Sequence, residues 1–516
     1  MNLKHEKSGG CLTAAAGKEG KMKRLAAILM ALVMAAALAG CSGPDGGQTQ
    51  APETGAAGGT GETEAGTQEA EVNTEITGTV TVGINSYRNS DFEAVCAAFN
   101  ERYPNITIEP ILFESDSDDA TEYLTSQAMA GKALPDIMYD DAGPIPTYIQ
   151  NGWMYPLTEF VQDDEEFALV PQSVVDRFTY GDNIYALGQT MRSNVLLINT
   201  DLVEELNVDL PELDWNWDDF TQFIQACTNS SYSGVEDLSE QYNWIPGAMT
   251  EGRSVIGYDP ETGTFDLESV QKFVNYYQEI SRLGGVEATS LKQNSQSGES
   301  DYVRKFGDVS GRDAAFIAGK VASTFTGTWL YASWMQQDLD FNWEMYPVPQ
   351  CVPGRIPVHI DYCWMTTSVA EENVEAAWTF LRFVTYSKEG NLARLTTYDE
   401  DHITADMYNT YYIPCTYDED VAEKFKSLPY VTEEIIYIYD NQENGYMADP
   451  EKTVPGFETV EYQTIGKIAY ESISGMYDFT SYMADAEQKA NQEIVEYQQL
   501  FDEALAKFEQ EFAASH

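Results

Sequence analysis

The sequence has few basic side chains. Its 516 residues include 29 Lys and Arg against 84 Asp and Glu, which gives a formal net charge of -55. A surface this acidic repels the phosphate backbone of nucleic acids and the anionic headgroups of lipids. We therefore expect no nucleic-acid partner and no basic patch that docks the protein on a membrane.

Histidine and cysteine are scarce as well. The four His residues are scattered, so the sequence predicts neither a metal site nor a bound cofactor. Five cysteines follow residue 42 without a Cys-x-x-Cys pair, and we interpret them as small buried hydrophobic residues. Cys351 and Cys363 flank a turn-rich stretch and could form a disulfide, which their spacing alone does not decide.

Common enzyme motifs are absent from the sequence. It contains no Gly-x-Ser-x-Gly, no His-Glu-x-x-His and no Walker-type loop. A glycosidase needs only two carboxylates about 5–10 Å apart, and so many acidic residues could place such a pair anywhere. The absence of these motifs argues against an enzyme, and a secreted hydrolase remains the alternative.

Long apolar segments are missing too. The longest run, residues 25–40, is shorter than the ~20 residues that span a bilayer. Basic residues precede the run and small residues end it, an order typical of an export signal, which we expect over residues 1–40. Its end, Leu-Ala-Gly-Cys41, resembles the bacterial lipobox, in which the cysteine is lipidated and becomes the mature N-terminus. The alternative is a buried helix with a chance cysteine.

The residues around this signal add two expectations. Residues 1–21 contribute nothing that a signal needs, so the true start is expected at Met22. Residues 41–75 consist of the lipidated cysteine and a stretch of Gly, Thr, Ala, Glu, Gln and Pro, which is predicted to be a disordered tether. We therefore expect a folded part that works on the extracytoplasmic face of the cell membrane.

The remaining chain is rich enough in apolar residues to fold, with 43% hydrophobic and 12% aromatic residues overall. Residues 78–84 and 106–112 read as strands, and residues 91–103 between them have apolar positions at helical spacing. A third strand is expected over residues 134–139. This order is typical of α/β sheets, which bind ligands at the carboxyl ends of their strands.

Four groups of residues, in this order, resemble the extracellular solute-binding proteins of bacterial ABC importers, specifically the sugar-binding family that includes maltose-binding protein. They are residues 134–141 with 151–157, residues 184–188 with 197–202, residues 316–322 with Gly327-Thr328-Trp329, and residues 376–383. The resemblance implies an α/β, type II periplasmic-binding-protein-like fold. Two lobes joined by a multi-strand hinge would close on a ligand in the cleft between them.

The resemblance also implies a function and lobe boundaries. The protein would be a monomer without enzyme activity that captures a carbohydrate, such as an oligosaccharide, and delivers it to an ABC permease. Residues 76–190 and 353–400 would form the first lobe, and residues 191–352 and 401–516 the second. A cationic or polyamine-like solute, or a sensor role, is the alternative within the same fold.

Ligand-binding positions in the first lobe follow from the family's pattern. Ser86, Tyr87 and Arg88 follow the first strand, where the family hydrogen-bonds sugar hydroxyls. Asp140 and Asp141 occupy the turn after a strand that lines the same wall. Carboxylates accept hydroxyl hydrogens, whereas Arg donates at fixed angles. The alternative for the two aspartates is a solvated turn or a helix cap.

Further positions lie near the hinge and in the second lobe. Arg192 and Asn194 are close to the first hinge crossing, where Arg192 could instead form a salt bridge between lobes. Trp329 matches an aromatic residue that stacks on a sugar ring, with a core position as the alternative. Trp244 and Tyr462 fall roughly where other cleft aromatics occur. Aromatic walls and a few convergent polar groups suit a pyranose ligand.

One strand departs from the family's pattern. Residues 357–364 carry bulky and charged side chains where many members have a Gly-rich strand, so Asp361 and Trp364 are expected to reshape the pocket. His359 is a further candidate, with a buried, hydrogen-bonded role as its alternative. Asp140, Asp141 and Asp361 together are the reason to consider a cationic solute.

Overall fold

The structure is a computed structural model, and its residues from Glu69 onward form one compact unit. The residues that it describes are 72–86, 92–114, 120–291, 300–397, 412–473 and 475–515. The export signal, Cys41 and nearly all of the predicted tether lie outside these residues. Within the described part of the chain, no helix combines the length and the apolar character needed to cross a membrane.

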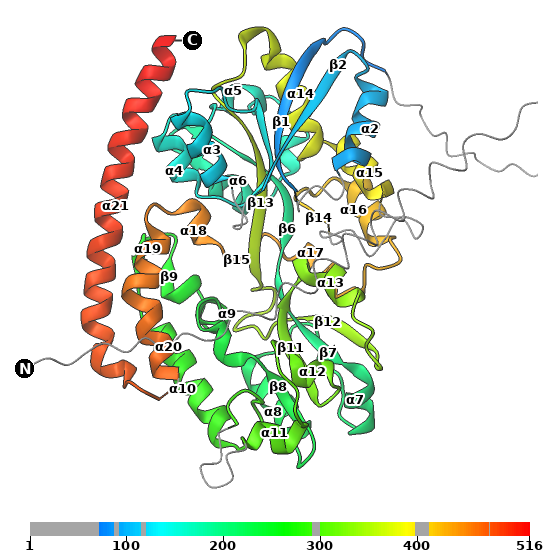
Figure 1. Ribbon diagram of the computed structural model, residues 1–516, viewed down its shortest axis with the longest axis vertical. Coiled ribbons are helices and arrows are strands. Elements are labelled where there is room, and N and C mark those ends of the chain that lie inside the picture. Colours follow the sequence, from blue (N-terminus) through cyan, green and yellow to red (C-terminus); the bar gives the residue numbers. More distant parts are fainter. Residues whose placement is uncertain are drawn as a thin grey trace, which may run out of the picture. The chain divides into compact units, whose positions relative to one another are not determined.

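The first lobe is built on a seven-stranded sheet (Figure 1). Its strand order is β14-β6-β13-β3-β1-β2, and β15 pairs with β13 outside this path. The strands are β1 (Gly78–Asn85), β2 (Ile106–Phe113), β3 (Ile137–Asp141), β6 (Leu187–Arg192), β13 (Pro357–Met365), β14 (Ile413–Pro414) and β15 (Tyr446–Met447). β1 runs parallel to β2 and β3, whereas β13 is antiparallel to β3 and β6.

Alternating residues of this sheet fill two cores. On β13, Cys363 and Met365 face the core shared with α2 and α14, while Tyr362 and Trp364 face the opposite core. This alternation follows from the two-residue period of a strand. The helices of the first lobe include α2 (Phe92–Arg102), α3 (Thr121–Met129), α4 (Ile145–Gln150), α5 (Thr158–Val161), α6 (Gln172–Arg177), α14 (Val374–Val384), α15 (Lys388–Thr397) and α16 (Glu419–Lys426).

The second lobe contains a four-stranded sheet of order β12-β7-β11-β8. Its strands are β7 (Asn194–Asn199), β8 (Ser233–Glu236), β11 (Val321–Gly327) and β12 (Trp343–Pro347). Helices around it include α7 (Thr200–Glu205), α8 (Trp217–Ala226), α9 (Ile245–Met249), α10 (Glu268–Arg282), α12 (Ala314–Ile317) and α20 (Lys467–Ile473). Asn216 begins α8 with a capping box that it forms with Asp219.

The two sheets meet at a tight crossing. Only Ser193 separates β6 of the first sheet from β7 of the second. Its buried hydroxyl donates to the Pro357 carbonyl at 2.7 Å, and its carbonyl accepts from the Thr328 N–H at 2.9 Å. Because Pro357 begins β13, this crossing lies beside the point where the chain returns to the first sheet.

The lobe boundary near residue 401 differs from the prediction. β14 pairs with β6 and β15 pairs with β13, so parts of residues 412–447 belong to the first sheet and not to the second lobe. Each of these strands has two residues, which is too short for a periodic pattern to reveal. The disulfide between Cys351 and Cys363 that the spacing left open is not formed, because all five described cysteines are free thiols.

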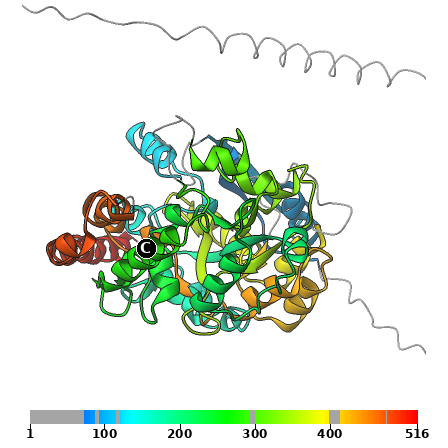
Figure 2. The ribbon, with the colours of Figure 1, turned by 90° about the horizontal axis from the view of Figure 1, so that it is seen from below.

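Helix α21 (Phe479–Ser515) contacts both lobes along its 37 residues and lies at the edge of the fold (Figure 1, Figure 2). In its first half, Asn491 hydrogen-bonds the backbone of Phe265 in the second lobe. In its second half, Phe501 packs edge-to-face on Tyr180 of the first lobe, with ring centroids 5.4 Å apart. This helix therefore bridges the two lobes.

Candidate functional site

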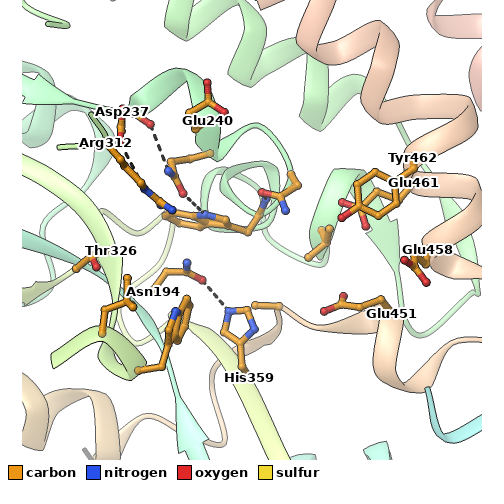
Figure 3. Close-up of a pocket in the computed structure, with 18 residues that line it drawn as sticks. Asn194, Asp237, Glu240, Arg312, Thr326, His359, Glu451, Glu458, Glu461 and Tyr462 are labelled. Carbon is orange, nitrogen blue, oxygen red and sulfur yellow. Dashed lines mark hydrogen bonds and ion pairs between the residues drawn. The ribbon is translucent and has the colours of Figure 1, made fainter. Parts of the chain in front are cut away.

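A cavity of about 670 Å³ lies where the hinge meets the second lobe (Figure 3). This volume is typical of small-molecule sites. Its lining comes from the hinge strands, the end of β11 with the turn η5 (Thr328–Leu330), the turn η3 (Leu238–Gln241), and the segment from α18 (Pro450–Thr453) through α19 (Phe457–Val460) to the π-helical η7 (Glu461–Gly466). Segments far apart in the chain therefore supply its walls.

Trp329 forms one aromatic wall, and its position depends on Gly327. A Cβ atom on Gly327 would lie only 2.3 Å from the indole ring, so glycine is required for the ring to lie against the backbone. The indole packs edge-to-face on the His359 ring, with centroids 5.2 Å apart. Thr328 forms two hydrogen bonds with Ser193, the residue between β6 and β7, so the neighbouring Trp329 is held at the point where the two sheets meet.

His359 links the two hinge strands beneath this indole. Its Nε2 lies 2.7 Å from the Asn194 Oδ1 atom, and both residues line the cavity. Burial lowers the pKa of His359 to about 4, so the imidazole is neutral at physiological pH. An amide oxygen only accepts, so Nε2 carries the hydrogen in this pair, and the Asn194 amide nitrogen keeps two donors.

Trp244 forms a second aromatic wall. Its Nε1 donates to the Gln241 Oε1 atom at 2.7 Å, and its ring packs edge-to-face on Phe325 of the second-lobe core. Gln241 in turn donates to the Asp237 carbonyl at 3.3 Å. These contacts hold the buried indole at the cavity with only 4% of its surface exposed.

The cavity is strongly acidic. Five of its lining residues carry carboxylates: Asp237, Glu240, Glu451, Glu458 and Glu461. Burial, followed by the charge of Asp449, raises the pKa of Glu451 to about 8. Burial and then Glu458 raise the pKa of Glu461 to about 7, and burial and then Asp313 raise that of Asp237 to about 7.

The predicted residues that line this cavity are Asn194, Trp244, Trp329 and Tyr462, together with the further candidate His359. Tyr462 is 61% exposed, whereas Trp244 is almost fully buried. The cavity therefore brings together the hinge residue and the three aromatic residues that the family's pattern indicated outside the first lobe.

Asp140 and Asp141 lie outside this cavity and are buried at the end of β3. Asp141 accepts hydrogen bonds from the backbone N–H groups of Ala120, Ala142 and Gly143 and from Trp364 Nε1. Asp141 thus holds a buried turn together and is neither a solvated turn residue nor the N-cap of α4, whose N-cap is Pro144. Asp140 has a positive φ of 51° and lies 3.8 Å from Arg192 across the sheet.

Arg192 and Asp361 also lie outside the cavity, in a buried charge network of the first lobe. Arg192 Nε contacts the Asp361 carboxylate at 2.5 Å, and Lys452 Nζ contacts the same group at 2.8 Å. Lys452 further pairs with Asp449, which binds Arg177. Arg192 and Asp361 both belong to the first sheet, so the salt bridge of Arg192, which was the alternative to ligand binding, lies within one lobe and not between lobes.

The other first-lobe candidates are not in the cavity either. Trp364 has no exposed surface and stacks on Tyr148, with ring centroids 5.2 Å apart. Ser86 lies at the end of β1 and donates to the Phe113 carbonyl. Tyr87 and Arg88 lie outside the described residues. The sequence does not show which of these candidates are buried, so it could not distinguish core residues from residues that face a ligand.

The residues that the sequence reasoning missed are the cavity carboxylates with Arg312 and Thr326. No local signal marks them, because acidic residues occur throughout this chain. The described residues contain no group of three or more His, Cys, Asp or Glu side chains arranged to hold a metal ion. The aromatic and polar side chains that line the cavity suit an organic ligand.

A model of the bacterial extracellular solute-binding proteins matches residues 94–401, which is more than half of the chain. The protein belongs to this family. Members of the family are the solute receptors of ABC importers and act outside the cytoplasm. The two-lobe arrangement around a hinge cavity fits this membership.

Solved structures of solute-binding proteins share the fold of this chain. An ABC substrate-binding protein of Listeria monocytogenes in complex with cycloalternan has a TM-score of 0.60 at 15% identity, over 81% of this chain and 99% of that chain. The sugar-binding protein MalE of Xanthomonas citri has a TM-score of 0.61 at 14% identity, over 82% and 99%. An ABC transporter solute-binding protein of Thermotoga lettingae bound to α-D-tagatose has a TM-score of 0.54 at 17% identity, over 81% and 100%. At these identities the likeness shows the shared type II fold.

Proposed function

We propose that this solute-binding protein captures a carbohydrate in the hinge cavity and delivers it to the permease of an ABC importer. The observation that carries the proposal is the pair of indole walls, Trp329 and Trp244, in one cavity with planar polar groups. The C–H face of a pyranose packs on an aromatic ring, and its hydroxyls need hydrogen-bonding partners at fixed angles. The solved relatives named above include complexes with sugars, which supports the same class of ligand here.

The polar lining suits the hydroxyls of such a ligand. The free donors of the Asn194 amide lie beside the Trp329 wall, and the Thr326 hydroxyl lies nearby at the end of β11. The cavity volume of about 670 Å³ is that of a site for a drug-sized ligand, which is larger than a single pyranose ring. We therefore propose an oligosaccharide and not a single sugar.

The mature protein is proposed to be a monomeric lipoprotein. The lipobox-like end of the export signal supports a lipid on Cys41, which would hold the folded part at the outer face of the cell membrane. Mass spectrometry of the membrane fraction tests this: the Cys41→Ser variant is expected to lose both the lipid mass and the membrane association. Recovery of the variant in the same fraction as the unaltered protein would contradict the anchor.

Binding, without catalysis, is the proposed role of the cavity, because the family consists of receptors and not of enzymes. Incubation of the protein with any oligosaccharide that it binds tests this, and the sugar is expected to be recovered intact. Cleavage products that appear with this protein and not with a Glu451→Gln variant would overturn the proposal in favour of a hydrolase.

Titration calorimetry with a panel of neutral oligosaccharides tests the site. The Trp329→Ala variant is expected to lose about 2 kcal/mol of binding free energy, which is a roughly 30-fold loss of affinity. The matched control is Trp378→Ala, because Trp378 stacks on Phe160 in the first lobe and does not line the cavity. Unchanged affinity in the Trp329 variant would remove the cavity from the proposed function.

A further inference from the structure

The charge in the cavity is unevenly distributed (Figure 3). One end of the cavity, which we call the acidic end, is formed by Glu451, Glu458, Glu461 and Tyr462. Burial and then the charges of these three carboxylates raise the pKa of the Tyr462 phenol. Arg312 lies at the opposite side, 3.7 Å from Asp237. Arg312 is the only Arg or Lys among the described residues that line the cavity. The acidic end thus has no basic side chain facing it from the lining.

The lysine that follows Glu451 in the sequence contacts groups outside the acidic end. Lys452 follows Glu451 directly, but its buried ammonium contacts Asp361 at 2.8 Å, Asp449 at 3.1 Å and the Ile360 carbonyl at 3.0 Å. The Ile360 carbonyl and Asp361 accept hydrogen bonds from this ammonium, and Asp449 forms an ion pair with it. Lys452 therefore mainly neutralises the network behind the cavity, and among the described residues no hydrogen bond or ion pair joins it to the acidic end.

Two of the three carboxylates of the acidic end are shielded from water, whereas Glu458 is exposed. Glu461 is only 5% exposed, and the side chain that hydrogen-bonds it, Asn243, is neutral. Among the described residues, no basic side chain forms an ion pair with the Glu451 carboxylate, and the charge of Lys452 only partly offsets its burial, since the pKa of Glu451 is still raised to about 8. Burying an ionised carboxylate without a partner of opposite charge is costly. A ligand that brings a positive charge would supply the partner that the protein lacks here.

Tyr462 adds an aromatic surface to this end. It is 61% exposed and lies beside Glu461 at the start of the π-helical η7. An ammonium group over a tyrosine face is attracted by the ring, and flanking carboxylates add charge-assisted hydrogen bonds. This pairing of ring and carboxylates favours an amine, because a neutral hydroxyl gains much less from a buried negative charge.

We propose that the acidic end of the cavity recognises a protonated amine, so that the ligand is a carbohydrate containing an amino sugar. This inference rests on the proposed function and narrows its ligand class. The indole walls take the neutral rings, and the amine lies between Tyr462 and the carboxylates of Glu451 and Glu461. Arg312, at the far side, faces the uncharged part of the ligand.

The test compares glucosamine oligosaccharides with their N-acetylated forms of equal length by calorimetry. Acetylation removes the charge and keeps the rings. We expect the amine form to bind at least tenfold more tightly, and a Glu451→Gln, Glu461→Gln double variant to lose at least tenfold of that affinity. The control is Glu279→Gln, an exposed carboxylate of α10 outside the cavity, which is expected to bind like the unaltered protein.

The outcomes separate this inference from the proposed function. Equal or weaker binding of the amine form, including no binding of either form, overturns the inference. If neutral oligosaccharides bind in that case, the carbohydrate function stands without the amine. Spermidine, an amine without a sugar, tests the reverse case, in which the acidic end binds amines but the ligand is not a carbohydrate. If spermidine binds at least as tightly as every sugar and the double variant abolishes that binding, the acidic end recognises amines but the carbohydrate assignment is overturned.

Discussion

Replacing Asp361 by Asn tests whether the buried charge network holds the first lobe to the hinge. Asp361 is 2% exposed and lies between Arg192 Nε at 2.5 Å and Lys452 Nζ at 2.8 Å. The amide keeps the size of the side chain but removes the charge. Two buried cations are then left with Asp140, 3.8 Å from Arg192, and Asp449, 3.1 Å from Lys452.

The expected cost follows from the burial of all the partners. Removing one member of a buried ion pair costs about 3–5 kcal/mol, because the other charge stays desolvated. Unfolding entropy scales at about 2.1 cal/mol/K per residue, so a folded part of this size changes its Tm by about 1 °C per kcal/mol. Differential scanning calorimetry should therefore show a Tm about 3–5 °C lower for Asp361→Asn.

An exposed ion pair provides the matched control. Lys426 and Asp440 contact at 2.6 Å, but their side chains are 35% and 48% exposed. Such pairs contribute about 0–1 kcal/mol, so Asp440→Asn should move the Tm by no more than about 1 °C. If Asp361→Asn lowers the Tm no further than this control does, the network does not stabilise the lobe and the reasoning from burial is refuted.

Three further predictions concern the cavity wall, the carboxylates and α21. Gly327→Ala should displace the Trp329 indole and weaken ligand binding at least tenfold, and an unchanged affinity in calorimetry would contradict the contact. The ligand-free protein should gain stability as the pH falls from about 8 to 5, because Glu451 and Glu461 with raised pKa values hold protons that the unfolded chain releases. Thermal melts should show a flatter profile in the Glu451→Gln, Glu461→Gln variant, whereas identical slopes would exclude the effect. Phe501→Ala should cost about 3–5 kcal/mol in denaturant unfolding, against less than about 0.5 for its 61% exposed neighbour Leu500→Ala, and equal losses would argue against the packing of α21 on the first lobe.

Local patterns predicted the elements that depend on local physics. The strands β1 and β2 and the helix α2 between them lie within one or two residues of their predicted bounds. Their apolar periodicity and the Pro104-Asn105 break are written in a short stretch of chain. β3 begins at Ile137, later than predicted, and β14 and β15 were missed, since pairing with distant strands defines them.

The site depended on contacts that sequence spacing does not contain. Asp141 is bound by Trp364, 223 residues away, and Asp361 by Arg192, 169 residues away. Without these partners in view, both aspartates looked available to a ligand. Trp329 was proposed because Gly327-Thr328-Trp329 matches the family's pattern, and the structure shows why the glycine accompanies the ring: a Cβ on Gly327 would overlap the indole.

The carboxylates of the acidic end could not be predicted from their spacing in the sequence. Glu451, Glu458 and Glu461 are spaced as if on one face of a single helix, yet Gly456 turns the chain between the first two with a φ of 71°. A Cβ there would lie 2.1 Å from the Tyr497 ring of α21, so only glycine lets α21 pack against this turn. The helix that contacts both lobes therefore also packs against the segment that carries the carboxylates. One glycine thus allows both the turn between Glu451 and Glu458 and the contact of this segment with the helix that bridges the lobes.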